Sequence, residues 1–452
     1  MNTARRVLPV LALAGISILG LSLLAYHARA DNTAVGVPSP DRGRLIAPGG
    51  QATVSNAVTR TADQMTSDSA LKSPVSNSSI LFRPTMPLEQ YRSLKSAAAG
   101  RAAAQSGGRN GGLRTASPAA LTPIIGAANF TGAAQGDNGV SSFPPDTHGA
   151  VSSSQLVETT NASVEVFSKA GALLSSFAHN AFVGSAAPLG DARVLYDSTW
   201  NRWVILIDDF STCFSGTGTP SFFLAVSTGS DATGPFFIYP VGLGFAPGAC
   251  FDFPQLGMDQ DAVIITANLF GFASPPAVAF GIAKARLYNG LGFGVPVFTG
   301  LVATLAPPIL QGAGAFDQNG ADFLAAAPNG SGILDIYTML DPERPNKTTL
   351  AGPAGITVAP YSIPPNAPQP GCPGSANLLD TSDNRFANAC TQTPNGHLFC
   401  AHGTGDFGLA TPRFYEIDPT GLTIVQSSDF FFSSSSYDFN PSIQANQSGD
   451  VS

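Results

Sequence analysis

A short structural unit recurs along this chain, and it restricts the possible folds more than any other feature. In its clearest copy, Gly190–Phe210, two apolar runs flank the polar turn at 197–202. Each run is too short for a helix and is rich in β-branched and aromatic residues, so the segment predicts a β-hairpin. An aspartate, Asp191, stands just before the first strand. The same order of Asp, strand, polar turn and strand returns further along the chain.

From about residue 124 the chain reads as successive four-stranded units, at spacings of roughly 45–65 residues. The turns between first and second strands carry Gly, Asn, Asp or Ser at hairpin positions. They read SSSQ, DSTWNR, DQDA, DQNGAD, TPNG and NQSGD. This recurrence predicts an all-β fold, a β-propeller of four-stranded antiparallel blades. A β-sandwich is the alternative, but it does not require a phased repeat.

The C-terminal part of the sequence contains five such units and the beginning of a sixth. An open ring would expose the unpaired edges of strands. We therefore expect the propeller over 124–452 to be incomplete at its C-terminus, with about six or seven blades in the full protein.

The first thirty residues predict a secretory signal peptide. Arg5 and Arg6 precede an apolar run over 7–24, and the small-x-small triplet 28–30 follows it. We expect cleavage there and a secreted or periplasmic protein with no further membrane span. An uncleaved membrane anchor is the alternative, because the apolar run approaches the length that spans a bilayer.

Residues 31–123 are poor in aromatic side chains and rich in Ala, Ser, Gly, Thr and Asn. Such a segment buries too little apolar surface to fold alone, so we expect a low-complexity, mostly disordered leader. Within it, Leu88, Tyr91 and Leu94 recur at helical spacing beside an alanine run. This pattern predicts a short helix near 87–105.

Composition excludes one class of partner. Only 12% of the residues are charged and the net charge is −8. The chain therefore offers no basic surface for nucleic-acid phosphates. Glycans and proteins remain as possible ligands, and the sequence does not address the oligomeric state.

The chain has five cysteines, and secretion permits disulfides. Cys213 and Cys250 fall in two loops that emerge on the same face of the propeller, so we expect them to pair. Cys390 and Cys400 face each other across a hairpin closed by the turn 394–396, and a second disulfide is possible there. Cys372 is then the odd thiol.

Aspartates recur before the first strand of most units, and these first strands line the central channel of a propeller. The set consists of Asp146, Asp191, Asp252, Asp383 and Asp438. Carboxylates that converge from several blades could hold Ca²⁺. Alternatively, each Asp caps the backbone of its own turn. The fourth unit departs from the pattern, because its nearest candidate, Asp317, follows the first strand.

A catalytic set is harder to find, so the expected function is a non-catalytic binding or surface-interaction module. The alternative is a sialidase-like or other hydrolase at the channel mouth. It would need an arginine cluster and acid–base carboxylates. Arg193 and Arg385 stand near channel-lining strands, whereas glutamate is scarce in the repeat region. No catalytic residue is assigned.

Several motifs resemble a family of secreted bacterial propellers that is distantly similar to the sialidase-like (BNR) propellers. They read PPDTHGAV, GDARVLYDSTWNRWV, AVSTGSDATGPF, DFPQLGMDQDAVIITANLF and LLDTSDNRFANA. The resemblance covers roughly residues 124–452 and implies a propeller fold. It implies no particular activity, since the family has none in common.

Overall fold

The computed structural model describes residues 43–71, 84–107, 129–137, 142–245, 247–271, 276–310, 321–372, 374, 377–446 and 448–451. The chain divides into residues 1–39 and a compact unit, Pro40–Ser452, which contains all the described residues. The expected signal peptide and Asp317 lie outside the described residues. Among the described helices, none combines the length and the apolar character needed to cross a bilayer.

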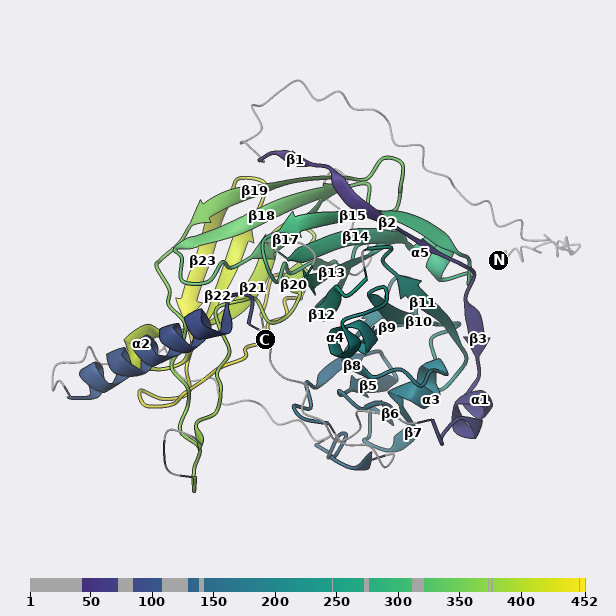
Figure 1. The fold of residues 1–452 in the computed structure, drawn as a ribbon, viewed down its shortest axis with the longest axis horizontal. Coiled ribbons are helices and arrows are strands. Elements are labelled where there is room, and N and C mark those ends of the chain that lie inside the picture. Colours follow the sequence, from purple (N-terminus) through teal and green to yellow (C-terminus); the bar gives the residue numbers. More distant parts are fainter. Residues whose placement is uncertain are drawn as a thin grey trace, which may run out of the picture. The chain divides into compact units, whose positions relative to one another are not determined.

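The prediction of a β-propeller is confirmed, and antiparallel blades follow one another along the chain (Figure 1). The first blade has β4 (His148–Val151), β5 (Gln155–Thr159), β6 (Ser163–Ser168) and β7 (Leu173–Ala178). The second has β8 (Leu189–Asp197), β9 (Arg202–Asp209), β10 (Ser221–Ser227) and β11 (Phe236–Gly242). The third has β12 (Cys250–Met258), β13 (Ala262–Phe270), β14 (Ala277–Ala283) and β15 (Phe293–Leu301).

The fourth and fifth blades follow the same order. The fourth contains β16 (Pro308–Leu310), β17 (Ala321–Ala326), β18 (Ile333–Leu340) and β19 (Thr349–Thr357). The fifth contains β20 (Cys390–Gln392), β21 (Leu398–Thr404), β22 (Thr411–Asp418) and β23 (Thr423–Asp429). Short helices lie in the connections: α3 (His179–Val183), α4 (Ser211–Ser215), α5 (Lys284–Leu287) and the 3₁₀ turn η3 (Asp406–Gly408).

The first strand of each blade, here called the inner strand, lies beside the inner strands of the neighbouring blades. β4 lies next to β8, and β8 next to β12. The short β16 pairs in parallel with both β12 and β20, through Met258↔Ile309 and Pro308↔Cys390. Because all the inner strands run in the same direction, their N-terminal ends gather at one opening, called the mouth below.

Apolar side chains fill the spaces between blades. Phe222 of β10 stacks on Phe251 of β12 with ring centroids 5.0 Å apart, and both rings are fully buried. Burying a side chain of this size stabilises the fold by about 1.5–3 kcal/mol. Trp203 is also fully buried, and its indole N–H donates to the carbonyl of Ser230 at 2.9 Å. Its neighbour in the hairpin, Trp200, is instead half exposed.

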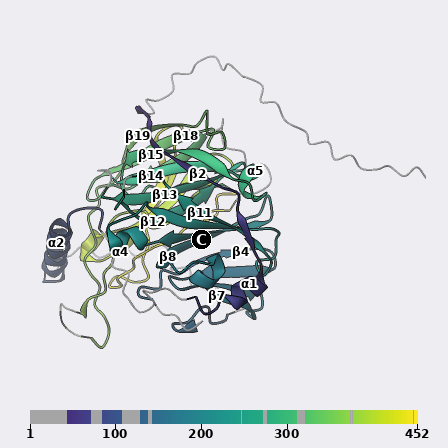
Figure 2. The same cartoon turned by 45° about the vertical axis from the view of Figure 1, so that its right-hand side comes forward.

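The expectation of a disordered leader is wrong for residues 43–71. This stretch forms β1 (Leu45–Ile46), β2 (Pro48–Val54), β3 (Val58–Arg60) and α1 (Ala62–Ser67). β1 pairs with β19, β2 with β15 and β3 with β11, each antiparallel. The segment 45–60, called the strap below, therefore adds an outer strand to the fourth, third and second blades in turn (Figures 1 and 2).

The strap folds despite its composition because the blades supply what it lacks. A strand that covers an existing sheet edge needs backbone N–H and C=O groups more than a core of its own. Alternate side chains still point inward, and Ala52 and Val54 are buried in the core between the second and third blades.

The predicted helix near 87–105 is confirmed as α2 (Leu88–Gly107). Hydrogen bonds from Tyr91 and Lys95 hold this helix against the loop before the fifth blade.

Both expected disulfides are present. Cys213 on α4 is joined to Cys250 at the start of β12, with Cα atoms 4.6 Å apart. Cys390 on β20 is joined to Cys400 on β21, with Cα atoms 4.8 Å apart. The hairpin register Thr391↔Phe399 agrees with the predicted pairing across the turn. Cys372 is an exposed free thiol.

Candidate functional site

A cavity of about 480 Å³ lies at the mouth, where the inner strands begin. Residues from the first, second, third and fifth blades line it, together with the turn at 440–441. Its charged lining comprises Asp146, Asp191, Arg193, Asp252, Asp380, Asp383 and Arg385. Four of the five predicted aspartates therefore gather at this mouth cavity, and Asp438 is not among its lining residues.

A left-handed residue lies before the inner strand or within its first part in each repeat. These residues, with their φ angles, are Asp146 (44°), Asp191 (44°), Phe253 (52°), Thr304 (55°), Ser382 (60°) and Asn440 (52°). Aspartate and asparagine tolerate this conformation better than most residues other than glycine. The conformation recurs in each repeat, whereas aspartate occupies it only in the first two blades. Asp252, Asp383 and Asp438 lie one or two residues away from it, which explains why the aspartates recur without a strict phase.

Asparagine side chains tie some successive blades together at this level. The backbone N–H of Asp191 donates to Asn161 Oδ1 at 2.6 Å, and that of Thr304 donates to Asn268 Oδ1 at 2.8 Å. In both cases the asparagine lies near the end of the second strand of one blade, and the donor lies near the start of the inner strand of the next blade. The asparagine amide thus satisfies a buried backbone group that would otherwise be costly.

The second blade has an aspartate, Asp208, at the equivalent position. The strand registers His148↔Thr159, Arg193↔Leu206 and Gln255↔Thr266 align three blades. Two residues beyond these partners stand Asn161, Asp208 and Asn268, respectively. The donor that would serve Asp208 is the N–H of Phe253, which instead donates to Asp191 Oδ2 at 3.3 Å.

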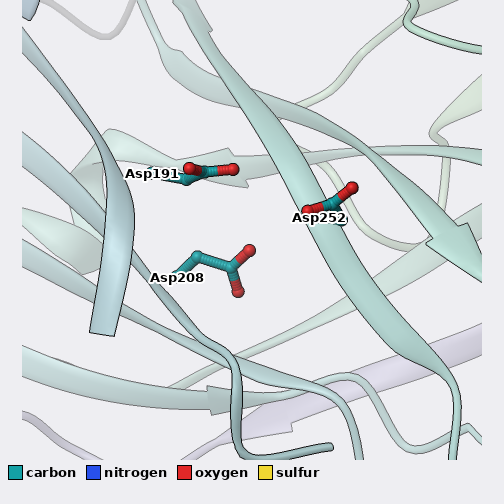
Figure 3. Close-up of side chains that lie close together, drawn as sticks. All are labelled: Asp191, Asp208 and Asp252. Carbon is teal, nitrogen blue, oxygen red and sulfur yellow. The ribbon is translucent and has the colours of Figure 1, made fainter. Parts of the chain in front are cut away.

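Asp208 forms a cluster with two of the predicted aspartates (Figure 3). Asp191 on β8, Asp208 on β9 and Asp252 on β12 each offer an oxygen, and these oxygens all lie within 4.8 Å of one another. Asp208 is fully buried, and neither of its carboxylate oxygens has a hydrogen-bond partner among the described residues. The cluster joins the second blade to the third, and its Asp191 and Asp252 line the mouth cavity.

Burial and mutual repulsion disfavour the charged forms of this cluster. Burial, followed by the charges of Asp252 and Asp146, raises the pKa of Asp191 to about 8. Burial and the nearby Asp191 and Asp252 raise the pKa of Asp208 well above its usual range. The backbone N–H of Asp209 approaches the Asp208 carboxylate without hydrogen-bond geometry, and it lowers that pKa less than burial raises it. A cation at this point would reverse the balance and favour ionised carboxylates.

Two guanidinium groups occupy another part of the mouth around Phe253. Arg193 lies 5.4 Å and Arg385 5.1 Å from the centroid of that ring, both in cation–π contact. Arg193 Nε donates to the carbonyl of Pro254 at 2.9 Å. Arg385 donates two hydrogen bonds of 2.8 Å to the carboxylate of Asp383. Burial alone would raise the pKa of Asp383, but the Arg385 charge and hydrogen bonds hold it below its usual value.

The structure thus separates the predicted aspartates into groups. Asp191 and Asp252 belong to the cluster, and Asp146 lines the same cavity close enough for its charge to raise the pKa of Asp191. Asp383 is ion-paired and accepts from the backbone of Arg385, as the alternative of a turn cap requires. Asp438 likewise accepts from the backbone N–H of Phe432 and from Ser436. Sequence reasoning missed Asp208, whose signal is its alignment with Asn161 and Asn268.

Comparison with known proteins gives matches among solved structures alone, because no family model and no curated protein matches the chain. An exo-β-1,3-galactanase from Phanerochaete chrysosporium is 16% identical, with a TM-score of 0.33 and coverage of 62% of this chain and 61% of that one. The haemagglutinin-neuraminidase of parainfluenza virus 5 is 9% identical, with a TM-score of 0.37 and coverage of 64% and 79%. A putative exo-β-1,3-galactanase from Bifidobacterium bifidum s17 is 12% identical, with a TM-score of 0.32 and coverage of 67% and 95%. The matching structures also include a WD40 domain and a protein of unknown function, and no activity is carried over from any of them.

Proposed function

We propose that this protein is a secreted, non-catalytic binding module, and that its mouth cavity binds a hydroxyl-rich, uncharged glycan. The mouth cavity itself supports the proposal. Its volume of about 480 Å³ falls in the range of about 300–1,000 Å³ typical of small-molecule sites. The two disulfides of the protein suit an extracellular location.

Charge indicates the class of glycan. The lining has five aspartates and two arginines, so its carboxylates outnumber its guanidinium groups. One of those arginines, Arg385, is already neutralised by Asp383. An acidic sugar would meet net negative charge there, whereas sugar hydroxyls can donate to carboxylates and accept from the amide of Asn388 and from Arg193.

The spacing of the acids disfavours the hydrolase alternative. Two-carboxylate glycosidases separate their acid and base by about 5–5.5 Å when retaining and about 6.5–9.5 Å when inverting. In the aspartate cluster, one oxygen from each carboxylate lies within 4.8 Å of the other two. The pKa values of two of these carboxyls are raised together rather than split between an acid and a base.

A glycan array with the whole chain, followed by calorimetric titration of the best binder, tests the proposal. We expect Ala387→Tyr, which fills the cavity, and Asn388→Ala to weaken binding. Asn289→Ala, at an exposed residue whose side chain donates to the nearby carbonyl of Ala285, is the matched control and keeps the affinity. The proposal would be overturned if no glycan on the array bound the protein, if Ala387→Tyr kept the affinity, or if the protein hydrolysed a fluorogenic glycoside.

A further inference from the structure

The buried carboxylate of Asp208 has no hydrogen-bond partner among the described residues that would offset the cost of its burial. Both of its oxygens lie away from solvent without a hydrogen-bond partner among the described residues. An ionised carboxylate in that state is costly, and a protonated one would still require an acceptor for its O–H group. Buried polar groups are nearly always satisfied, so an orphan of this kind points to an atom that binds there from outside the chain.

The repeat supplies an internal comparison. Asn161 and Asn268 occupy the same register position in the first and third blades, and each accepts from the next inner strand. An asparagine in the second blade could make the same contact with the N–H of Phe253. The chain has Asp208 instead, and Asp191 takes that N–H. The substitution therefore replaces a satisfied neutral amide by a charged oxygen ligand.

The cluster has the composition and dimensions of a calcium site. Its three members are carboxylates from different strands, the hard oxygen ligands that Ca²⁺ prefers over the imidazole and thiolate ligands typical of Zn²⁺. Two oxygens bound to one Ca²⁺, each about 2.3–2.6 Å from the ion, can be up to about 5.2 Å apart. The three oxygens lie within 4.8 Å of one another, so small side-chain adjustments can bring them into one coordination sphere. Because Asp191 and Asp252 face the mouth cavity, water or ligand hydroxyls can complete that sphere.

We propose that Asp191, Asp208 and Asp252 bind a Ca²⁺ ion that joins the second blade to the third at the mouth. The ion neutralises three carboxylates that otherwise repel one another, and it gives Asp208 its missing partner. The site is complete without a glycan, so this inference does not rest on the proposed ligand. Binding to the folded form alone raises stability by linkage.

The test uses the whole chain after dialysis against EDTA, with no glycan present. Calorimetric titration with CaCl₂ and with MgCl₂ measures the affinity, and Tb³⁺ luminescence reports occupancy of the same site. Thermal melts with and without Ca²⁺ measure the stabilisation. We expect one Ca²⁺ per chain and a higher melting temperature with Ca²⁺.

The informative variant is Asp208→Asn, because Asn161 and Asn268 show that the fold accommodates asparagine at this position. Its Ca²⁺ affinity should fall by at least about tenfold, the loss that even mutation of a ligand-orienting residue can cause. Its melting temperature in EDTA should equal or exceed that of the wild type, because one of three crowded carboxylates is gone. Asp438→Asn, at a predicted ring residue outside the cluster, is the matched control and keeps both properties.

Two outcomes would overturn the proposal: no Ca²⁺ binding by the wild type, or an unchanged Ca²⁺ affinity in Asp208→Asn. Tighter binding of Mg²⁺ than of Ca²⁺ would overturn the assignment of calcium. A variant that only misfolds would lose stability in EDTA, which contradicts the expected result. A wild-type chain that binds glycan but no Ca²⁺ would refute this inference and leave the proposed function standing.

Discussion

The side chain of Asn161 accepts a hydrogen bond from the backbone N–H of Asp191 at 2.6 Å, and this contact joins the first blade to the second. Asn161 also donates from Nδ2 to the carbonyl of Pro144 at 2.9 Å. One amide, bonded to the backbone through both its oxygen and its nitrogen, therefore positions the left-handed residue of the second inner strand. The same amide indirectly sets the direction of the Asp191 carboxylate within the acidic cluster.

We expect Asn161→Ala to lower the free energy of unfolding by about 1–3 kcal/mol, because it leaves buried donors and acceptors unpaired. Urea unfolding monitored by the fluorescence of the two tryptophans measures the loss. The control is Asn289→Ala, whose side chain is exposed. Equal stability of the two variants would show that the Asn161 bonds contribute nothing.

The raised pKa of Asp191 predicts how stability depends on pH in the absence of metal. The pKa is about 8 in the folded chain and about 3.9 in an unfolded one. The folded state therefore binds the additional proton between those values, and stability falls as pH rises from about 4 to about 8. Urea titrations in EDTA across this range should show the decline, and Asp191→Asn should make it shallower, with the raised pKa of Asp208 accounting for the remainder. A wild-type stability that rises over the same interval would contradict the assignment.

The two disulfides predict a definite peptide map. Under non-reducing conditions, a Cys213 peptide should be joined to a Cys250 peptide and a Cys390 peptide to a Cys400 peptide. Alkylation without reduction should label Cys372 alone. The double substitution Cys213→Ser and Cys250→Ser should cost about 2–4 kcal/mol of stability. Cys372→Ser, at an exposed free thiol, should cost nothing measurable.

The strap predicts a protease-resistant core that begins near residue 43 rather than near 124. Limited proteolysis followed by N-terminal sequencing locates that boundary. Ala52→Asp places a charge in the core between the second and third blades and should destabilise the fold by several kcal/mol (roughly 3–5). Thr53→Asp, at the neighbouring exposed position, is its control. Removal of 43–71 by protease without loss of stability would refute this role of the strap.

Local patterns carried most of what could be predicted. Hairpins such as 189–209 and 390–404 are encoded by their own turns and alternation, so the blades and the Cys390–Cys400 pairing could be predicted from short windows. The Cys213–Cys250 pairing followed from the expected propeller, which places both loops on one face. The strap could not be predicted in this way, because its partners are distant in sequence: Leu45 pairs with Ala351 and Val54 with Phe293. The strap itself also contains few large apolar side chains. Its strand character comes from the edges it covers.

The candidate site was predicted in part for a related reason. Asp191 and Asp252 stand out in the sequence because they precede apolar runs, although the structure places both inside the inner strands. Asp208 lies near the end of a buried run and reads as its ordinary polar boundary. Its meaning emerges only when the second strands are aligned by register with Asn161 and Asn268. Asp383 fits the sequence pattern as well as Asp191 does, but Arg385 two residues later neutralises it.

The pairing of the strap has a consequence for the order of folding. Residues 45–60 leave the ribosome before any blade exists, yet β3 needs β11, β2 needs β15 and β1 needs β19. These strands must therefore wait until more than half of the chain has been made, and the contacts that they finally form are distant in sequence. Such distant contacts slow folding because the loop must close before the pairing stabilises it. Until that moment the second, third and fourth blades carry open edges, so the newly made chain depends on rapid arrival of its own N-terminal segment to avoid pairing with another molecule.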